Sequence, residues 1–270
     1  MKIGVFDSGL GGLYIFRKLL KYLPAYDYIY LGDNARVPYG GRSPELIYQF
    51  TKRAVDFLFH KDCQIVILAC NTASANALTR LQRKYLPENF SERRVLGIII
   101  PTVEAAVEEN FKKIGIIGTR ATIDSQSYPA ELKKLAPEIK VYQKECSLLV
   151  PLIEEGELEW EGLDLLIKKY LKALPLTKLN GLILACTHYG LIGDQIKRNL
   201  PTRVKVISQG EVVAEKFKSY LQRHPEMESK LDKNSRRTYY VTDLTHRYED
   251  LIKLFLVNHF KNAKLELVNI

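Results

Sequence analysis

Short apolar runs that end in Gly, Asp, Ser, Thr or Cys alternate with longer amphipathic stretches along almost the whole chain. Nearly every position in the short runs is apolar, whereas apolar side chains in the longer stretches recur at helical spacing. This alternation is typical of repeated β-loop-α units, so the expected fold class is α/β with mainly parallel strands. Strands are predicted at residues 2–6, 28–31, 64–69, 94–99, 113–117, 140–143, 181–185 and 205–207. Helices are predicted at residues 13–22, 44–60, 73–85, 103–111 and 160–174.

The last part of the chain continues this pattern. A strand is predicted at residues 238–241, a helix at 248–260 and a final short strand at 265–268. Earlier in the chain, Ser43 followed by Pro44 predicts a helix start, because the hydroxyl caps the first turn and the proline presets its backbone. No glycine- or proline-rich linker separates two halves, so we expect any domain boundary where the chain crosses between packed units.

Two pairs of segments resemble each other. KIGVFDSG at residues 2–9 resembles KIGIIGTRAT, which begins at Lys113, and VILACNTAS at Val66 resembles LILACTHYG at Leu182. The two offsets, 113 − 2 = 111 and 186 − 70 = 116, are similar. All buried parallel strands need runs rich in Val, Ile and Leu, so strand likeness alone has little weight. The repeat of Ala-Cys before a polar residue has no such origin, and it indicates two related lobes that face each other.

Composition places the chain among globular proteins. Hydrophobic residues make up 46% and charged residues 26% of the 270 residues, which excludes disordered, collagen-like and disulfide-scaffold classes. No apolar run approaches the roughly eighteen residues that a membrane-spanning helix needs. The start, MKIGVFDSG, reaches Asp7 before the core of a signal peptide could develop, so we expect a cytoplasmic protein without a secretory signal.

A net charge of 40 − 31 = +9 raises the question of nucleic-acid binding. The basic residues are spread along helical segments and form no recognisable nucleic-acid motif. We therefore expect a small-molecule substrate and neither a nucleic-acid nor a membrane partner. A non-catalytic binder of acidic metabolites or of nucleic acid is the rival interpretation from another class, and such a binder would not need paired thiols.

Most residues with candidate chemistry directly follow predicted strands. In open α/β sheets, ligands bind outside the carboxyl ends of the strands, where loops and helix N-termini offer polar groups and N–H donors. These positions therefore predict one crevice that suits a small carboxylate ligand. The glycines after Asp7, in DSGLGG, lack the GxGxxG spacing of a dinucleotide site and are expected to bring the backbone close to a small ligand. The residues at strand ends are Asp7, Ser8, Cys70, Asn71, Thr72, Thr119, Thr122, Cys186, Thr187 and His188.

The four cysteines form no CxxC pair and are too scattered for a disulfide framework. Cys63 and Cys146 are expected to be small buried apolar residues. Cys70 and Cys186 both end predicted strands next to Asn or Thr, and the internal symmetry places them on opposite walls of one cleft. A closed zinc site between them would need further ligands, and His188 is the one nearby candidate.

Two opposed thiols suit proton transfer at a carbon held between them. One removes a proton as a thiolate and the other delivers a proton from the far side, so such a site inverts a stereocentre. A disulfide switch is the alternative, and a thiol redox protein would lose free thiols reversibly without turnover. An unperturbed thiol is only a few per cent thiolate at neutral pH, so its surroundings must prepare it. His188 can do this beside Cys186, whereas Asp7 either accepts a proton or orients the ammonium group of a ligand.

Several ordered motifs carry a family resemblance. They are DSGLGG at Asp7, PYGGRS at Pro38, LACNTAS at Leu68, GTRAT at Gly118, VPLIEEGE at Val150 and LACTHYG at Leu184. With them the chain resembles the glutamate racemase family of the aspartate/glutamate racemase superfamily. The resemblance implies a homodimeric isomerase that interconverts L- and D-glutamate without pyridoxal phosphate, a metal or another cofactor. The D-glutamate would feed peptidoglycan synthesis, and hence cell-wall biogenesis and cell shape; a racemase of a related acidic amino acid such as aspartate is the alternative.

The same resemblance implies a fold of two pseudo-symmetric α/β lobes. Each lobe would be a mainly parallel sheet flanked by helices, with the active site in the cleft between the lobes. Residues 1–97 plus 209–270 would form the first lobe and residues 98–208 the second. The C-terminal segment would thus return to complete the first lobe, which agrees with the missing linker.

The resemblance also implies roles for individual residues. Cys70 would act on D-glutamate and Cys186 on L-glutamate, assisted by Asp7, Glu154 and His188. The residues that would hold the carboxylates and the ammonium group of the substrate are Asp7, Ser8, Pro38, Tyr39, Gly40, Asn71, Thr72, Thr119, Thr122, Thr187 and His188.

Three positions depart from the family pattern. Tyr14 stands where Thr usually follows GGL, Gly190 stands where Pro usually follows CTHY, and the usual acidic residue near Ser208 is missing. None of these departures removes a thiol. We therefore expect them to change the packing of the two motif loops and the affinity for substrate, and to leave the reaction type as it is.

Overall fold

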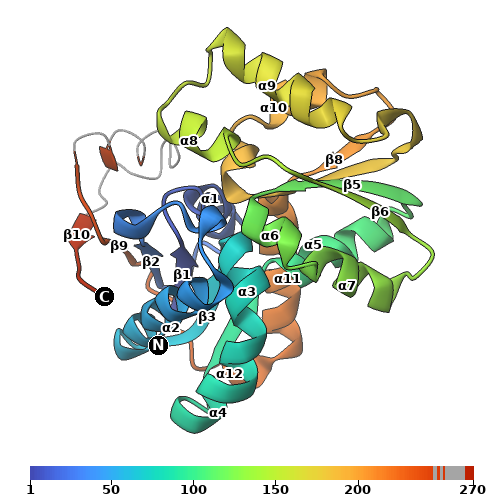
Figure 1. Ribbon diagram of the computed structural model, residues 1–270. Helices are drawn as coiled ribbons and strands as arrows, with labels where there is room; N and C mark the ends of the chain where they lie inside the picture. The colour runs from blue at the N-terminus through green and yellow to red at the C-terminus, as the bar shows by residue number, and fades with distance from the viewer. Residues whose placement is uncertain (246–247, 250–251, 253–264) are drawn as a thin grey trace.

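The structure, a computed structural model, describes residues 1–245, 248–249, 252 and 265–270. Within that part of the chain the strands form two sheets, and the paired strands run parallel (Figure 1). The first sheet holds β1 (Lys2–Asp7), β2 (Tyr28–Gly32), β3 (Cys63–Leu68), β4 (Arg94–Gly97), β9 (Arg237–Val241) and β10 (Leu265–Leu267). The second sheet holds β5 (Lys113–Gly118), β6 (Lys140–Glu145), β7 (Gly181–Ala185) and β8 (Lys205–Ile207).

The four strands of the second sheet are arranged in the same spatial order as β2, β1, β3 and β4 of the first sheet. The first sheet has the order β10-β9-β2-β1-β3-β4, and the second has the order β6-β5-β7-β8. β5 therefore corresponds to β1 and β7 to β3, and these are the strands of the two pairs of similar segments in the sequence. The predicted pseudo-symmetry is confirmed, and Cys70 and Cys186 follow corresponding strands.

Helices cover both faces of each sheet. The longer helices are α1 (Leu13–Tyr22), α2 (Pro44–His60), α3 (Asn71–Arg80), α5 (Ile99–Glu108), α7 (Ser127–Leu135), α9 (Glu161–Lys172) and α11 (Gln209–Arg223). The shorter ones are α4 (Leu86–Asn89), α6 (Arg120–Asp124), α8 (Leu149–Glu154), α10 (Gly193–Arg198) and α12 (Pro225–Glu228), with 3₁₀ turns that include η2 (Tyr39–Gly41) and η5 (Thr187–Gly190). In Figure 1, α9 and α10 lie on one side of the second sheet and α5 and α7 on the other. None of the described helices combines the length and the hydrophobicity that a bilayer crossing requires.

Strand side chains are buried on both faces of the sheets, which explains the continuous apolar runs in the sequence. Val5 belongs to the core that α1 and α11 cover, whereas Phe6, its neighbour on β1, belongs to the core that α2 and α3 cover. On β7, Leu184 packs with residues of α9 and Ile183 with residues of α5 and α7. The core beneath α1 and α11 is continuous with the core beneath α9, so the two sheets share one packed interior.

The helices predicted at 13–22 and 44–60 agree with α1 and α2 at both ends. The capping prediction at the start of α2 is also confirmed, because the hydroxyl of Ser43 accepts the N–H of Leu46 at 3.4 Å. Continuous apolar or amphipathic segments with clear end signals were thus sufficient to place these elements.

The strand predicted at 94–99 is wrong at its end. β4 stops at Gly97, and α5 begins at Ile99, earlier than the predicted helix at 103–111. A run of branched apolar residues suits a strand, but here Thr102 donates from its hydroxyl to the carbonyl of Ile98 at 2.6 Å and closes the first helical turn. Tertiary packing therefore overrides the local strand preference.

One further helix prediction differs from the structure at its ends, and another falls mostly outside the described residues. The helix predicted at 73–85 begins at Asn71, because Cys70 supplies its N-cap, and it passes into a π-helical stretch at Leu81–Tyr85. The helix predicted at 248–260 lies for the most part outside the residues that the structure describes.

The chain crosses between the two sheets at two places. It leaves the first sheet after β4 and enters α5, and it returns from β8 directly into α11, which packs against α1 and α5. Each crossing takes only a few residues, which agrees with the missing linker in the sequence.

Candidate active site

Cys70 lies where the first sheet gives way to α3. It is the N-cap residue of this helix, and its Sγ accepts the N–H of Ala73 at 3.5 Å. The hydroxyl of Ser8, in the loop after β1, lies 3.3 Å from the same sulphur. A helix N-terminus and a hydroxyl both stabilise negative charge on sulphur, so the position suits a thiol that must ionise during a reaction.

Cys186 occupies the corresponding place at the end of β7. Its Sγ lies 3.7 Å from Nδ1 of His188, which belongs to η5. On the other side of the ring, Nε2 of His188 lies 3.1 Å from Oε1 of Glu154, the last residue of α8. The Cys186 sulphur, the His188 imidazole and the Glu154 carboxylate are therefore connected in a series that begins at this wall of the cleft.

Asp7 ends β1 and is fully buried. Its Oδ2 accepts the N–H of Gly9 at 3.0 Å, and its Oδ1 accepts the hydroxyl of Thr187 at 3.4 Å. Thr187 lies between Cys186 and His188 in the chain, so this carboxylate ties the loop after β1 to the loop that carries the second thiol.

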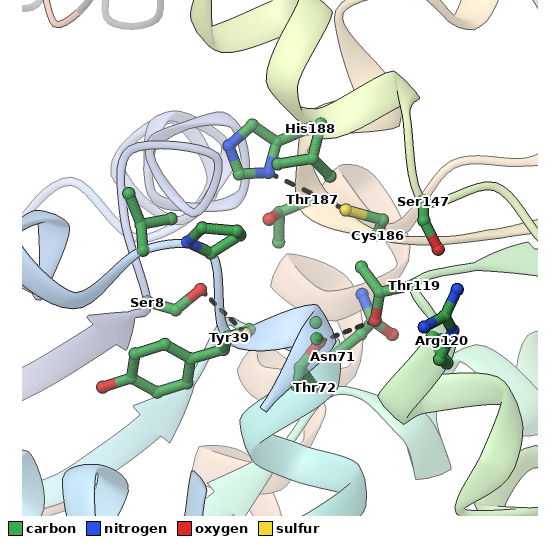
Figure 2. A pocket seen from close by; sticks show the side chains of 16 residues that line it. Ser8, Tyr39, Asn71, Thr72, Thr119, Arg120, Ser147, Cys186, Thr187 and His188 are labelled. Carbon is green, nitrogen blue, oxygen red and sulfur yellow. Dashed lines mark hydrogen bonds between the residues drawn. The ribbon is translucent and has the colours of Figure 1, made fainter. Parts of the chain in front are cut away.

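Both sulphurs border a single pocket of about 170 Å³ between the two sheets. Figure 2 shows Cys186, Thr187 and His188 on one wall and Ser8 and Tyr39 on the opposite side. The pocket thus has one thiol from each half of the molecule.

The structure brings most of the sequence-predicted site residues together. Those that line the pocket are Ser8, Pro38, Tyr39, Gly40, Cys70, Asn71, Thr72, Thr119, Cys186, Thr187 and His188. Asp7, Thr122 and Glu154 lie behind the wall instead, and each is hydrogen-bonded to a residue that lines it.

Five lining residues were missed by the sequence analysis: Val37, Gly41, Arg120, Ser147 and Val150. Gly41, Arg120 and Val150 stand inside the motifs PYGGRS, GTRAT and VPLIEEGE, so the extent of each motif was a signal that could have found them. Val37 and Ser147 lie outside the motifs and carry no such signal.

Three threonine hydroxyls form a cluster at one end of the pocket. Oγ1 of Thr72 lies 2.9 Å from that of Thr119 and 3.3 Å from that of Thr122, and the last two lie 3.0 Å apart. Gly40 approaches this cluster so closely that a Cβ there would lie 2.7 Å from the Cβ of Thr119. Hydroxyl donors beside the N-terminus of α3 suit a carboxylate of a small ligand.

The surroundings of Cys70 favour the neutral thiol. Burial and then the charge of Asp7 raise the pKa of this thiol to about 12, although the hydrogen bonds from Ser8 and from the N–H of Ala73 act in the opposite direction. In the free protein at neutral pH, Cys70 is therefore a proton donor.

His188 is in the opposite situation. Burial by itself would lower its pKa, but the hydrogen bonds to Cys186 and Glu154 outweigh this effect, and the pKa of His188 lies well above its ordinary value. The ring is therefore charged at neutral pH, and an imidazolium at this distance stabilises negative charge on the Cys186 sulphur.

The two walls of the pocket thus differ in electrostatic state. A carbon held between them has a neutral thiol on one side and, on the other, a sulphur beside a positive charge. This arrangement suits removal of a proton from one face and delivery of a proton to the opposite face. Among the described residues, no group of three or more His, Cys, Asp and Glu side chains is arranged to hold a metal ion.

The three departures from the family pattern lie in contact with one another. The hydroxyl of Tyr14 lies 2.7 Å from that of Ser208, and a Cβ added to Gly190 would lie 2.8 Å from ring atoms of Tyr14. The larger side chain on α1 therefore fits because position 190 has no Cβ, and its hydroxyl has that of Ser208 as a partner. The three positions thus meet at one contact of Tyr14 behind Cys186.

The glycine loop after β1 makes a second close approach. A Cβ added to Gly11 would lie 2.5 Å from both Nδ1 of His188 and Oγ1 of Thr187. From the sequence we expected these glycines to approach a ligand. In the structure, Gly11 instead approaches the loop that follows Cys186.

Comparisons with known proteins agree with this architecture. The model of the family described as Asp/Glu/Hydantoin racemase matches residues 3–217. The chain is 39% identical to a glutamate racemase of Sulfurihydrogenibium sp. over 99% of this chain and 98% of that one, and 40% identical to that of Aquifex aeolicus over 95% and 94%. The crystal structure of glutamate racemase from Francisella tularensis in complex with D-glutamate has a TM-score of 0.88 and 35% identity, and the match covers 99% of this chain and 97% of that one.

The contact between Tyr14 and Gly190 is open to a direct test. The change Gly190→Ala should destabilise the protein by about 1–3 kcal/mol, because the ring of Tyr14 is held by Ser208 and cannot move away freely. In a Tyr14→Thr background the same change should cost little, so urea unfolding of the four proteins should give a coupling free energy of about 1 kcal/mol or more. The control is Gly193→Ala, where the nearest atom to the new Cβ is 4.0 Å away. Additive effects of the two changes would contradict the contact.

Asp7 should make the stability of the protein depend on pH. Burial raises the pKa of this carboxyl, although His188 and the N–H groups of Gly9 and Gly12 offset part of the effect. A raised pKa in the folded state means that the stability contribution is present below the ordinary value and is lost as pH rises through the folded-state pKa. Asp7→Asn should therefore gain stability relative to the wild type as pH rises from acidic to neutral values, measured by thermal unfolding.

The matched control is Asp27, a buried carboxyl whose pKa is shifted in the opposite direction. Burial acts to raise the pKa of Asp27, but hydrogen bonds from Arg236 and Asn234 outweigh it and the pKa is lowered. Asp27→Asn should therefore lose stability relative to the wild type as pH rises through the same range. The same trend in both variants would contradict the assignment for Asp7.

Proposed function

Because the chain belongs to the Asp/Glu/Hydantoin racemase family and is an amino-acid racemase, we propose that it interconverts L- and D-glutamate by proton transfer at Cα between two thiols, without a cofactor. The observation that carries this proposal is the position of Cys70 and Cys186, which follow corresponding strands of two sheets and border one pocket. Glutamate is the substrate that best fits the relatives at 39% and 40% identity, which are glutamate racemases, and the Francisella structure, which holds D-glutamate.

The proposed reaction conserves protons and charge. In the direction from L to D, the Cys186 thiolate takes the α-proton, so the Cα–H bond breaks and an S–H bond forms. Cys70 then delivers its own thiol proton to the opposite face of Cα, which leaves Cys70 as the thiolate and the stereocentre inverted. This form of the enzyme is the one that acts on D-glutamate, which agrees with the roles that the resemblance implies.

The two thiols are prepared by different neighbours. His188, held by Glu154, stabilises negative charge on Cys186. Ser8 and the N-terminus of α3 stabilise negative charge on Cys70 once its proton has been delivered. The burial that keeps Cys70 neutral in the free protein makes it the acid for the first turnover on L-glutamate.

The substrate would be held by the groups around the thiols. The hydroxyls of Thr72 and Thr119 and the N-terminus of α3 suit a carboxylate, and Arg120, which is ion-paired with Glu145, lies at the pocket wall. The buried carboxylate of Asp7 accepts the hydroxyl of Thr187, which lines the pocket, and it suits orientation of the substrate ammonium group. Fixed donors of this kind hold Cα between the sulphurs and so reduce the cost of reaching the transition state.

The wider assignments rest on the resemblance. We propose that the enzyme acts in the cytoplasm as a homodimer and that its D-glutamate enters peptidoglycan synthesis. We propose too that residues 1–97 plus 209–270 form one lobe and residues 98–208 the other, a division that the two separate sheets support. An aspartate racemase is the alternative, and the relative turnover of the two amino acids discriminates between them.

Loss of either pocket thiol should abolish racemisation. Cys70→Ala and Cys186→Ala should each lower turnover of both enantiomers by roughly two to four orders of magnitude, the usual contribution of a general acid or base. The measurement is circular dichroism with proton NMR of L-glutamate in deuterium oxide without added cofactor, where the D-glutamate that forms early should carry deuterium at Cα. The control is Cys63→Ala, a buried cysteine outside the pocket, which should keep nearly full activity. Full turnover after loss of Cys70 would contradict the two-thiol proposal.

A further inference from the structure

Gln209 is the first residue of α11, at the crossing from the second sheet back to the first half of the molecule, and it is 3% exposed. Its carboxamide contacts side chains from three other helices: Asn71 on α3, Thr102 on α5 and Tyr128 on α7. All three partners are buried. A buried polar group of this kind is costly unless it is fully hydrogen-bonded, so its presence calls for a reason.

The hydrogen bonds around Gln209 form a closed ring. Nε2 of Gln209 donates to the hydroxyl of Tyr128 at 2.8 Å, that hydroxyl donates to Oδ1 of Asn71 at 2.6 Å, and Nδ2 of Asn71 donates back to Oε1 of Gln209 at 2.6 Å. Within this ring each member gives one proton to the next, and Nε2 of Gln209 also lies 3.1 Å from Oδ1 of Asn71. Taken alone, such a ring can run in either direction, since both carboxamides can turn over.

Thr102 fixes the direction of the ring. Its hydroxyl donates to the backbone carbonyl of Ile98 at 2.6 Å, so its oxygen must accept from Nε2 of Gln209, which lies 2.9 Å away. A carbonyl can only accept, so this bond determines which end of the Gln209 carboxamide faces Thr102. The orientation then passes through Tyr128 to Asn71.

The orientation of Asn71 matters because this residue, which follows Cys70 in the chain, lines the pocket (Figure 2). In the observed direction Oδ1 of Asn71 accepts from Tyr128 and, at 3.1 Å, from Nε2 of Gln209, and Nδ2 of Asn71 donates one hydrogen to Gln209. No other acceptor among the described residues contacts Nδ2, so its second hydrogen is left for a ligand. A reversed ring would present the carbonyl oxygen of Asn71 instead and would repel a carboxylate.

We propose that Gln209 is a positioning residue for the racemase: with Thr102 and Tyr128 it locks the Asn71 carboxamide so that an N–H, and not the carbonyl, meets a carboxylate of the substrate. The inference rests on the proposed function for the identity of that substrate. Gln209 acts through Asn71 and does not itself line the pocket.

The kinetic test compares Gln209→Leu, which removes the ring, with Thr102→Val, which keeps the shape but removes the bond that sets its direction. For Gln209→Leu, KM for L- and D-glutamate should rise by about tenfold or more, the usual effect of losing a hydrogen bond to a charged group, with a smaller change in kcat. Thr102→Val should raise KM less, because the ring persists in both directions. The matched control is Glu211→Gln in the same turn of α11, outside the ring, and it should leave KM unchanged.

A second variant gives a signature that a merely structural role would not produce. Gln209→Glu keeps the size of the side chain but loses the Nε2 donor at neutral pH. Protonation of the introduced carboxyl group restores a donor, so the ratio of variant to wild-type kcat/KM should rise as pH falls. Unchanged KM in Gln209→Leu and Thr102→Val, with activity lost only in proportion to the unfolded fraction, would overturn the proposal.

A readout without turnover separates this inference from the proposed function. In isotope-labelled wild-type protein, the side-chain N–H proton of Asn71 that is hydrogen-bonded to Gln209 should exchange slowly with solvent in NMR spectra, and Gln209→Leu should speed this exchange by about tenfold or more. Slow exchange in a wild-type protein that does not racemise glutamate would contradict the proposed function and support the positioning role of Gln209. Fast exchange in an active wild-type protein would contradict the positioning role of Gln209 and leave the proposed function intact.

Discussion

The contact between the glycine loop after β1 and the loop after β7 is the constraint on which the rest of the site depends. Gly11 lies so close to Thr187 and His188 that no larger residue fits, and Asp7 accepts the hydroxyl of Thr187 across the same junction. This junction brings the end of one sheet against the end of the other. Because each sheet carries one thiol at a corresponding strand end, the junction also determines that both thiols border one pocket.

The symmetry of the backbone does not extend to the charges. Cys70 is buried near the Asp7 carboxylate with a hydroxyl and a helix N-terminus for partners, whereas Cys186 lies beside an imidazolium backed by Glu154. Two corresponding positions on the same fold thus have different surroundings, which suits the proposed acid and base. This difference in surroundings is what a reaction at one carbon needs, since a proton must leave on one side and arrive on the other.

Much of this arrangement was predictable from the sequence, because the signals were local. Apolar runs that end in polar residues place the strands, and the repeated Ala-Cys places both thiols at corresponding strand ends. The partners of Gln209 were not predictable, because Thr102 and Tyr128 lie on different helices and no motif joins them. The start of α5 was missed because the run at Ile98–Ile100 suits a strand equally well, and only its packing decides. Tyr14 and Gly190 were visible as separate departures, but their contact depends on how α1 meets η5.

The central claim is that the two pocket thiols lie in different electrostatic surroundings before substrate binds, and alkylation of the free protein tests it most directly. The exposed fractions of the two residues are similar, 5% for Cys70 and 7% for Cys186, so a large difference in rate reports the surroundings of the two sulphurs. With iodoacetamide near neutral pH and mass spectrometry of the peptides, Cys186 should be modified well before Cys70, and D-glutamate should slow both reactions. Modification of Cys70 first, or of both thiols at the same rate, would contradict the account.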